Sequence, residues 1–281
     1  MSVTTPEPSL RRVAAIAAAL RVLPVASLSP RRARKLLGRN FYVYRRAWPL
    51  LISGLLEPLF YLLSIGIGLG HLVGTIELYG HALSYRRYVA PALLAAAAMN
   101  GSLLDTTYEL YYKLTIARTY EGVLATPLSV ADVALGELAW AVIRGATYST
   151  VFLGVMAALG LVASPFALLA IPTAALVAFA FAAAGMAATS FARSWADLEA
   201  VFLFVVPSFL FSGVFYPLST LPHWVASITA WTPLYQGVEV ARALDNGFVG
   251  WGLAGHAGYL VAMGMVALAV TSARLERLLA S

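Results

Sequence analysis

Residues 88–114 read YVAPALLAAAAMNGSLLDTTYELYYKL. The first half is almost wholly apolar and rich in alanine, a composition that favours helices and lets neighbouring helices approach closely inside a membrane. Asp105 and Glu109 follow four residues apart, so a helix places both carboxylates on one face. Acids in a final helical turn would oppose the helix dipole. We therefore expect a membrane-spanning helix that continues past these acids, through YYKL, into the cytoplasm.

The rest of the chain shares this apolar character. Hydrophobic residues make up 60% of the 281 residues, charged residues make up 11%, and the mean hydropathy is +0.80. Soluble domains carry about 25% charged residues, so this composition excludes a water-soluble globular protein. It predicts an all-α polytopic membrane protein. Six transmembrane helices are expected, at about 47–70, 88–112, 133–161, 166–191, 197–213 and 251–272.

The basic residues indicate the orientation of the chain. Ten of the nineteen Lys and Arg residues precede residue 47, which in a membrane protein points to anionic headgroups rather than to a nucleic-acid partner. With the N-terminus inside, fifteen basic residues are cytoplasmic, and three lie outside: Arg86, Arg87 and Arg242. This asymmetry predicts that both termini are cytoplasmic. The excess of Arg over Lys and the abundance of Ala suggest a GC-rich bacterial genome, hence a bacterial plasma membrane.

The chain is expected to divide into three parts. Residues 1–29, rich in Pro, Ser and Arg, form a cytoplasmic tail. Residues 30–46 interleave basic and aromatic side chains, which suits an amphipathic helix lying in the headgroup plane. Residues 47–281 form the six-helix transmembrane domain.

Ionisable residues at membrane depth are the first functional candidates. Glu57, followed by Pro58, lies near the middle of the first expected span, where it faces either a substrate path or a subunit interface, or is protonated or paired inside the bundle. Asp105 and Glu109 are candidates for the same path, or mark the polar end of their span.

Glu137, Trp140 and Arg144 lie on one face of the third expected span, at i, i+3 and i+7. Arg144 is expected to pair with one of the nearby acids. A structural ion pair is favoured over transport chemistry.

The sequence contains no motif that indicates catalysis. No Cys is present, and the four His residues are scattered without metal-ligand spacing, so no metal site is expected. A phosphate-binding P-loop requires Lys followed by Ser or Thr, whereas Lys35 and Lys113 are each followed by Leu. If transport is driven by ATP, a separate subunit must bind the ATP and Mg²⁺.

The segment between the second and third spans, residues 113–140, is longer than a simple link requires. A short helix there, about 114–127, would place one apolar stripe on a single face: Ile116, Tyr120, Val123 and Leu124. Such a stripe, with a central acid, suits docking into a groove on a partner protein. The alternative is a helix lying on lipid.

The chain resembles the permease subunits of type-2 ABC exporters, and within them it is most similar to lipo-oligosaccharide (nodulation-factor) export permeases and their drug-efflux relatives. The matching stretches occur in the family's order through most of residues 39–242: RNFYVYRR, EPLFYLLSIGIGLG, YVAPALLAAAAMNGSLLDTTYELY, RTYEGVLATPLSVADVALGELAWA, FSGVFYPLSTLPHWV and TPLYQGVEVAR. Each motif is weak alone, and the ordered set is specific.

The resemblance implies two permeases, identical or related, above two ATP-binding-cassette ATPase subunits. It also implies a cytoplasmic coupling helix, whose contacts with the ATPase fall on the RTYEG stretch: Arg118, Thr119, Tyr120, Glu121 and Gly122. The tail before residue 30 is not part of the pattern.

FSGVFYPLSTLPHWV, residues 211–225, breaks its helix without turning polar. The apolar and aromatic character continues to about residue 250, and Trp and Tyr favour the headgroup level. The region from about 213 to 250 is therefore expected to re-enter the outer leaflet as short helices, with Ser219 or Thr220 capping the second. The residues expected to shape this outer gate or rim are Gly213, Phe215, Pro217, Pro222 and Trp224.

The predicted function is the transmembrane subunit of an ATP-driven exporter. Its substrate would be an amphiphile taken from the cytoplasmic leaflet: a lipid-linked saccharide, a lipid or a hydrophobic drug. The alternative is a partner-free channel or secondary transporter that uses Glu57 and Asp105 as ion or proton sites. A lipid-modifying enzyme lacks a recognisable nucleophile or base.

Overall fold

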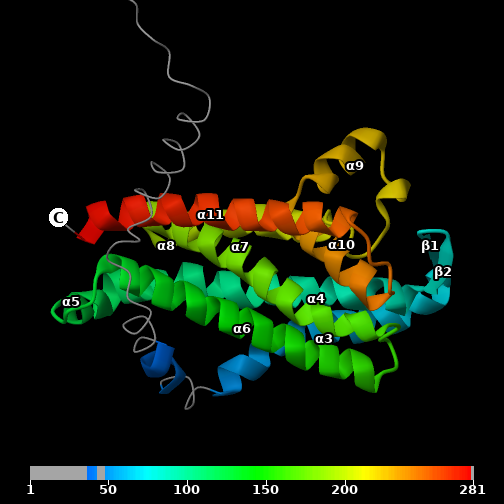
Figure 1. Ribbon diagram of the computed structural model, residues 1–281, viewed down its shortest axis with the longest axis horizontal. Helices are drawn as coiled ribbons and strands as arrows, with labels where there is room; N and C mark the ends of the chain where they lie inside the picture. The colour runs from blue at the N-terminus through cyan, green and yellow to red at the C-terminus, as the bar shows by residue number, and fades with distance from the viewer. Residues whose placement is uncertain (1–36, 43–47, 280–281) are drawn as a thin grey trace, which may run out of the picture.

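The computed structural model describes residues 37–42 and 48–279. The helices form an elongated bundle, in which α4 (Tyr85–Leu104), α6 (Val130–Ala158), α7 (Ala170–Phe191) and α11 (Gly252–Leu279) run along the long axis (Figure 1). The short helix α5 (Thr119–Leu124) and the C-terminus lie at one end. A β-hairpin and helix α9 (His223–Ala230) lie at the other end. The end with α5 is the one that the sequence predicts to be cytoplasmic.

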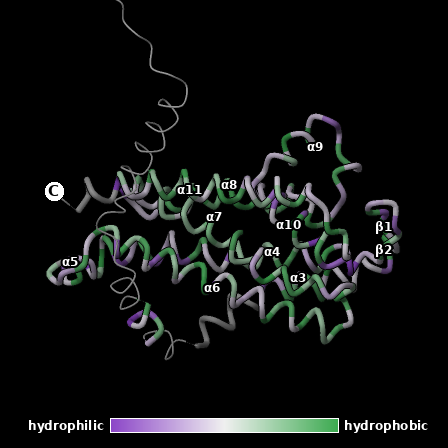
Figure 2. The backbone as a smooth tube through the Cα atoms, viewed as in Figure 1, coloured by the Kyte–Doolittle hydropathy of each residue, from purple (hydrophilic) through white to green (hydrophobic). Residues whose placement is uncertain are grey.

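Five helical segments are long and apolar enough to cross a membrane among the residues described. They are Leu56–Val73 within α3 (Trp48–Val73), Tyr85–Ile116, Val130–Ala158, Pro165–Phe191 and Gly252–Arg274. The remaining expected span corresponds to α8 (Trp195–Leu210), which has only 16 residues. All six expected spans are therefore helices, with ends shifted by a few residues, and the all-α prediction is confirmed. Figure 2 shows hydrophobic residues along α7, α8 and α11 and hydrophilic ones in the hairpin.

Helix α4 forms the centre of the bundle. Its side chains from Tyr88 to Met99 are buried, and it packs against α3, α6 and α7. Small residues allow this close approach. A Cβ atom at Gly101 would overlap the ring of Tyr148, and a Cβ at Gly145 of α6 would meet Ala98 of α4. The alanine-rich sequence of this span therefore positions α4 and α6 at close range.

The helix that begins as α4 continues beyond Leu104 in two π-helical turns, η2 (Asp105–Glu109) and η3 (Tyr112–Ile116). The hydroxyls of Thr106 and Thr107 donate to the carbonyls of Ser102 and Leu103, at 2.9 and 2.7 Å. Side-chain donors of this kind compete with the backbone for helix carbonyls, which suits a wider turn. The prediction that this helix continues past its acids is confirmed.

Two helices begin at the α5 end with the same capping arrangement. Ser129 caps α6 and pairs with Asp132, and Ser194 caps α8 and pairs with Asp197. In both, the serine hydroxyl accepts from a backbone N–H while the aspartate accepts from the N-cap N–H. These boxes fix the positions at which both helices start.

The opposite end contains a hairpin that the sequence analysis does not anticipate. Strands β1 (Thr75–Leu78) and β2 (His81–Ser84) pair antiparallel, with Thr75 opposite Ser84. The turn places Tyr79 and Gly80 at positive φ. The strands have four residues each and pair only with each other, so they form a small hairpin in the connection between α3 and α4.

The broken segment after α8 forms the pair of short helices expected there. A 3₁₀ turn, η5 (Leu218–Thr220), leads to α9, and α10 (Pro233–Asp245) follows and packs against α4 and α7. The 3₁₀ helix η4 (Pro165–Leu169), which precedes α7, packs against α10. The expected Ser219 or Thr220 cap is wrong. Pro222 occupies the N-cap of α9 without a side-chain hydrogen bond, and the Thr220 hydroxyl donates back to Pro217 O at 2.8 Å.

Candidate functional site

Charged side chains from three segments converge at the α5 end of the bundle. They come from residues 37–42, from the π-helical extension of α4, and from α6, and they lie beside α5. The residues that the structure brings together are three bases and three acids: Arg39, Lys113, Arg144, Asp105, Glu109 and Glu137. We call this set the ion network.

Two bases link the acids into a chain. Arg144 of α6 pairs with Asp105 and lies 3.6 Å from Glu109, measured between Nη1 and Oε2. The Nζ of Lys113 lies 2.7 Å from Glu109 Oε1 and 2.8 Å from Glu137 Oε2. Each of these basic side chains thus contacts two acids on different turns or helices. The expected pairing of Arg144 with a nearby acid is confirmed.

The N-terminal segment joins the network through Glu137. The amide of Asn40 donates to Glu137 Oε2 at 3.3 Å, and Arg39 Nη2 lies 3.7 Å from Glu137 Oε1. Asn40 itself is only 2% exposed. Glu137 therefore receives contacts from both the N-terminal segment and the end of the α4 extension.

The charges of the network balance, since three cationic side chains face three anionic ones. Asp105, Glu137 and Arg144 are buried, at 8%, 6% and 9% exposure. Burying a charge is costly unless it is paired, and removal of one partner leaves the other uncompensated. The network therefore couples the positions of the segments that carry its side chains.

Helix α5 is anchored beside this network by Tyr120. Its side chain is 2% exposed and packs in a cluster with Leu110, Val133 and Leu138. Burial, and then the nearby carboxylate of Glu137, raise the pKa of the Tyr120 hydroxyl. The phenol therefore stays protonated beside Glu137 at physiological pH.

The opposite side of α5 is exposed. Arg118, at φ 43°, begins the helix, and its guanidinium lies 3.8 Å from Glu121 Oε1, with both side chains about 70% exposed. Gly122 is exposed, with open space around its Cα, and Thr119 is half-buried. The expected outward-facing apolar stripe is wrong. Tyr120 points inward, and Ile116 belongs to η3, because the left-handed Arg118 separates the two helices.

Glu57 lies away from the network. It is exposed on α3 and lines a cavity of about 190 Å³ between α3, α4 and α8. Tyr61 and Asn100 provide the other polar groups of the wall, and Phe202 and Phe209 of α8 provide aromatic ones. Pro58 lies inside α3, which continues as a helix through it.

Two tyrosines connect this cavity to the network. Tyr108, within η2, stacks on Phe202 at 5.3 Å and on Trp195 at 6.0 Å between ring centroids. Tyr111 contacts the edge of Trp195 at 5.1 Å. The helical turns that carry Asp105, Glu109 and Lys113 therefore also hold the first half of α8.

At the hairpin end, Gly213 of the broken segment has φ 71°. The Gly213 carbonyl accepts from Arg242 Nη2 at 2.6 Å and from the Tyr88 hydroxyl at 3.0 Å. Arg242 also donates to Tyr88 O and Glu239, and it is 1% exposed. This arginine fastens the chain after α8 to α4 and α10.

The other residues of the outer segment take different places. The Phe215 ring packs on Tyr61 and Phe209, and its carbonyl accepts from Tyr85 at 3.1 Å. Pro217 precedes η5 and Pro222 precedes α9. Trp224 is 69% exposed on α9.

The sequence analysis identifies part of this site. Asp105, Glu109, Glu137 and Arg144 meet, and Trp140 is buried on the same helix as the last two. It does not assign Arg39, Asn40, Lys113 or Arg242 to a site. The i+4 spacing from Glu109 is a signal that could have identified Lys113, whereas nothing local links Arg39 or Arg242 to partners about 100 or more residues away.

Comparisons with known proteins agree with the resemblance. Residues 32–245 match the family described as ABC-2 type transporter. Nodulation protein J of Rhizobium meliloti (strain 1021) is 31% identical over 85% of this chain and 90% of its own length. Nodulation protein J of Sinorhizobium fredii (strain NBRC 101917 / NGR234) is 30% identical, over 86% and 92%. The inner membrane transport permease YadH of Escherichia coli (strain K12) is 24% identical, over 75% and 80%.

Proposed function

The chain belongs to the ABC-2 type transporter family, and from this membership we propose that it is the permease subunit of an ATP-driven exporter that moves an amphiphile out of the cytoplasmic leaflet of a bacterial plasma membrane. Its partners are ATP-binding-cassette ATPases, which bind ATP and Mg²⁺, and a second permease, identical or related. Both termini are cytoplasmic in this proposal. The network at the α5 end then faces the ATPases.

The single observation that carries the proposal is the two-sided placement of α5. Arg118 and Glu121 are exposed on one side, where a partner can contact them, while Tyr120 is buried against the helices that hold the ion network. A force applied to the exposed side therefore reaches the bundle through a buried anchor. A helix lying only on lipid would have no need of an exposed ion pair opposite that anchor.

The network offers a route from α5 to the substrate cavity. Tyr120 lies beside Glu137, which pairs with Lys113 on the α4 extension. Tyr108 on that extension stacks on Phe202, which lines the cavity containing Glu57. Movement of α5 would shift the extension, and the stacked rings would pass that shift to α8. The bases can exchange between acids during the movement, since Lys113 and Arg144 each contact two.

The cavity suits an amphiphile by its mixed wall. The Glu57 carboxylate, the Tyr61 hydroxyl and the Asn100 amide can hydrogen-bond a polar headgroup, and Phe202 and Phe209 provide apolar contact. The partner-free transporter is less well supported, because Asp105, one of its two intended ion sites beside Glu57, is paired with Arg144.

The test is co-purification of the tagged full-length chain from its own organism, followed by mass spectrometry of the bound proteins and reconstitution in vesicles. We expect an ATPase with a P-loop to co-purify, and transport of a fluorescent lipid to require ATP. Transport by the chain alone, driven by an ion gradient, would contradict the proposal.

The role of α5 is tested separately by reversing its exposed charges. Glu121→Arg combined with Arg118→Glu is expected to reduce ATPase binding and transport-coupled ATP hydrolysis without changing the melting temperature. Glu77→Arg, on the exposed hairpin at the other end, serves as the control. Unchanged binding and coupling in the α5 variant would show that this helix is not the contact.

A further inference from the structure

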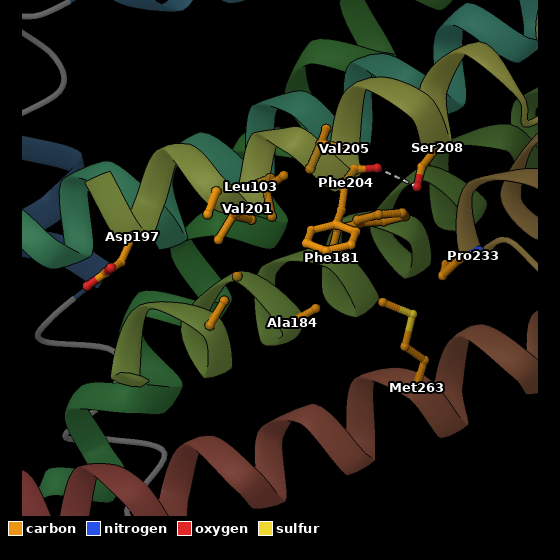
Figure 3. Close-up of a pocket in the computed structure, with 13 residues that line it drawn as sticks. Leu103, Phe181, Ala184, Asp197, Val201, Phe204, Val205, Ser208, Pro233 and Met263 are labelled. Atoms are coloured by element: carbon orange, nitrogen blue, oxygen red, sulfur yellow. Dashed lines mark hydrogen bonds between the residues drawn. The ribbon is translucent and has the colours of Figure 1, made fainter. Parts of the chain in front are cut away.

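A second cavity lies between α8, α7 and α11. Its volume is about 440 Å³, within the range of ligand pockets. Figure 3 shows Val201, Phe204 and Val205 on α8 above Phe181 and Ala184 of α7, with Met263 of α11 on the far side. We call this space the α7–α8–α11 groove.

The groove offers no free polar group to a ligand in its middle. The Ser208 hydroxyl donates to Phe204 O at 2.7 Å, within α8. The Asp197 carboxylate, at the cytoplasmic end, accepts from the backbone N–H groups of Arg193 and Ser194 at 2.7 and 2.9 Å. The remaining lining side chains are apolar, so the occupant must be hydrocarbon along this length.

The groove has the length of a leaflet. From Asp197 to Ser208 along α8 is about 16 Å at the helical rise of 1.5 Å per residue. Half of the hydrocarbon core of a bilayer is about 15 Å thick. Phe204 and Ser208 also line a further apolar cavity of about 370 Å³ that extends to Trp224 of α9. One extended chain fits this shape.

The helices that border the groove also carry exposed apolar side chains, as expected of a surface against lipid: Leu203 of α8 and Val266 of α11 are 72% and 66% exposed. Two arginines lie near its cytoplasmic end, where the Asp197 carboxylate is already hydrogen-bonded to backbone. The Arg274 side chain donates to Ser190 O at 3.4 Å and lies over the Phe191 ring, and Arg193 is exposed in the turn before α8.

We propose that the α7–α8–α11 groove binds one acyl chain of a phospholipid of the cytoplasmic leaflet, with the phosphate beside Arg193 and Arg274. The site adjoins the Glu57 cavity, with which it shares Leu103 and Val205, and extends from there between α7 and α8 toward Met263 of α11, whereas the Glu57 cavity extends toward α3. The bound chain fills the space between α8 and α11 and supports a helix that has only one buried side chain of its own, Leu198. This site does not depend on the transported substrate.

The experiment uses the full-length protein in nanodiscs of phosphatidylcholine containing phosphatidylglycerol with a diazirine in one acyl chain. After illumination, labelled residues are located by mass spectrometry, and labelling at Val201 and Val205 is divided by labelling at lipid-facing Val266. Ala188→Phe fills the groove from α7, and Ala262→Phe adds the same group on the exposed face of α11 as a control. Val201→Trp fills the groove from α8 if Ala188→Phe fails to fold, with Met263 labelling read in place of Val201.

The labelling ratio is expected to fall roughly tenfold in Ala188→Phe, because displacing a few buried methylene groups costs about that much affinity. It should not change in Ala262→Phe. A ratio that is the same in folded groove-filling variants as in the native chain would overturn the proposal.

Two further outcomes bear on the occupant. Labelling should decrease several-fold in Arg193→Gln combined with Arg274→Gln, and unchanged labelling would overturn the position of the phosphate. The chain has no native Cys, so Val201→Cys reports directly on a protein occupant. A disulfide between two copies through this residue would show that a second chain, and not lipid, covers the groove.

Discussion

The two ends of the bundle bury charge in different ways. At the α5 end, Arg144 and Lys113 each contact two carboxylates carried by other turns or helices. At the hairpin end, Arg242 is held by the carbonyls of Tyr88 and Gly213 and by Glu239, and it stacks on the Tyr88 ring at 3.9 Å. Neither oxygen of nearby Asp245 has a hydrogen-bond partner among the described residues.

This difference bears on which end can move. Side-chain pairs can exchange partners at similar energy, so the ion network can keep its charges paired while segments shift. The backbone carbonyls of Tyr88 and Gly213 offer Arg242 no such alternative, because they move only with the backbone that carries them. We therefore expect motion at the α5 end and a fixed arrangement at the hairpin end, and substitutions at each end test this.

The largest effect is expected at Arg242. Arg242→Met leaves Glu239 without this cation and the carbonyls of Tyr88 and Gly213 with fewer donors. The free energy of unfolding should fall by about 3–5 kcal/mol, as when one partner of a buried charged contact is removed. Chemical unfolding in mixed micelles measures it. Arg86→Met, exposed at the same end, is the control, and an equal loss there would remove the special role of Arg242.

Arg144→Met is expected to lower the free energy of unfolding by slightly less, about 2–4 kcal/mol. Glu109 keeps its contact with Lys113 in this variant, whereas Asp105 loses its cation. Asp105→Asn in the same chain should restore most of the loss, and a double-mutant cycle gives the coupling energy. Additive effects of the two substitutions would contradict a network of interacting charges.

Asp245 predicts a pH dependence of stability at the hairpin end. Burial raises its pKa to about 7, and Arg87 partly opposes the shift. The folded state therefore holds this proton more tightly than the unfolded state, so stability is highest below the unfolded pKa of about 4 and falls as pH rises to about 7. Asp245→Asn should remove this part of the slope and stabilise the protein by on the order of 2 kcal/mol at pH 8 but little at pH 4. Unfolding curves of both proteins at several pH values test this. If stability depends on pH in the same way in Asp245→Asn as in the native chain, Asp245 is paired and does not cause the slope.

The smallest effect is expected from Tyr120→Phe, which keeps the packed ring and should lower the free energy of unfolding by about 1 kcal/mol or less. Its matched contrast is Tyr120→Ala, which removes the ring, should cost about 3–5 kcal/mol and should detach α5. Hydrogen exchange across Thr119–Leu124 measures the detachment. Equal exchange in both variants would mean that the ring does not anchor the helix.

The helical architecture followed from local composition. Alanine-rich and apolar runs predicted every long helix, and the prolines around residues 217–233 predicted the break after α8. The hairpin was missed because its two strands, TIEL and HALS, are too short for a periodic signal. The apolar stripe across residues 116–124 was wrong because it assumed one continuous helix, and Arg118 interrupts it.

Composition is enough to predict an apolar helical bundle, since membrane burial acts on each segment separately and is visible in that segment's residues. Spacing is enough to place Asp105, Glu109, Glu137 and Arg144 on helix faces. Which charges meet depends on how the helices pack. Asn40 contacts Glu137 across 97 positions, and Arg242 contacts Tyr88 across 154. Such pairings arise from how helices pack, and no local pattern encodes them.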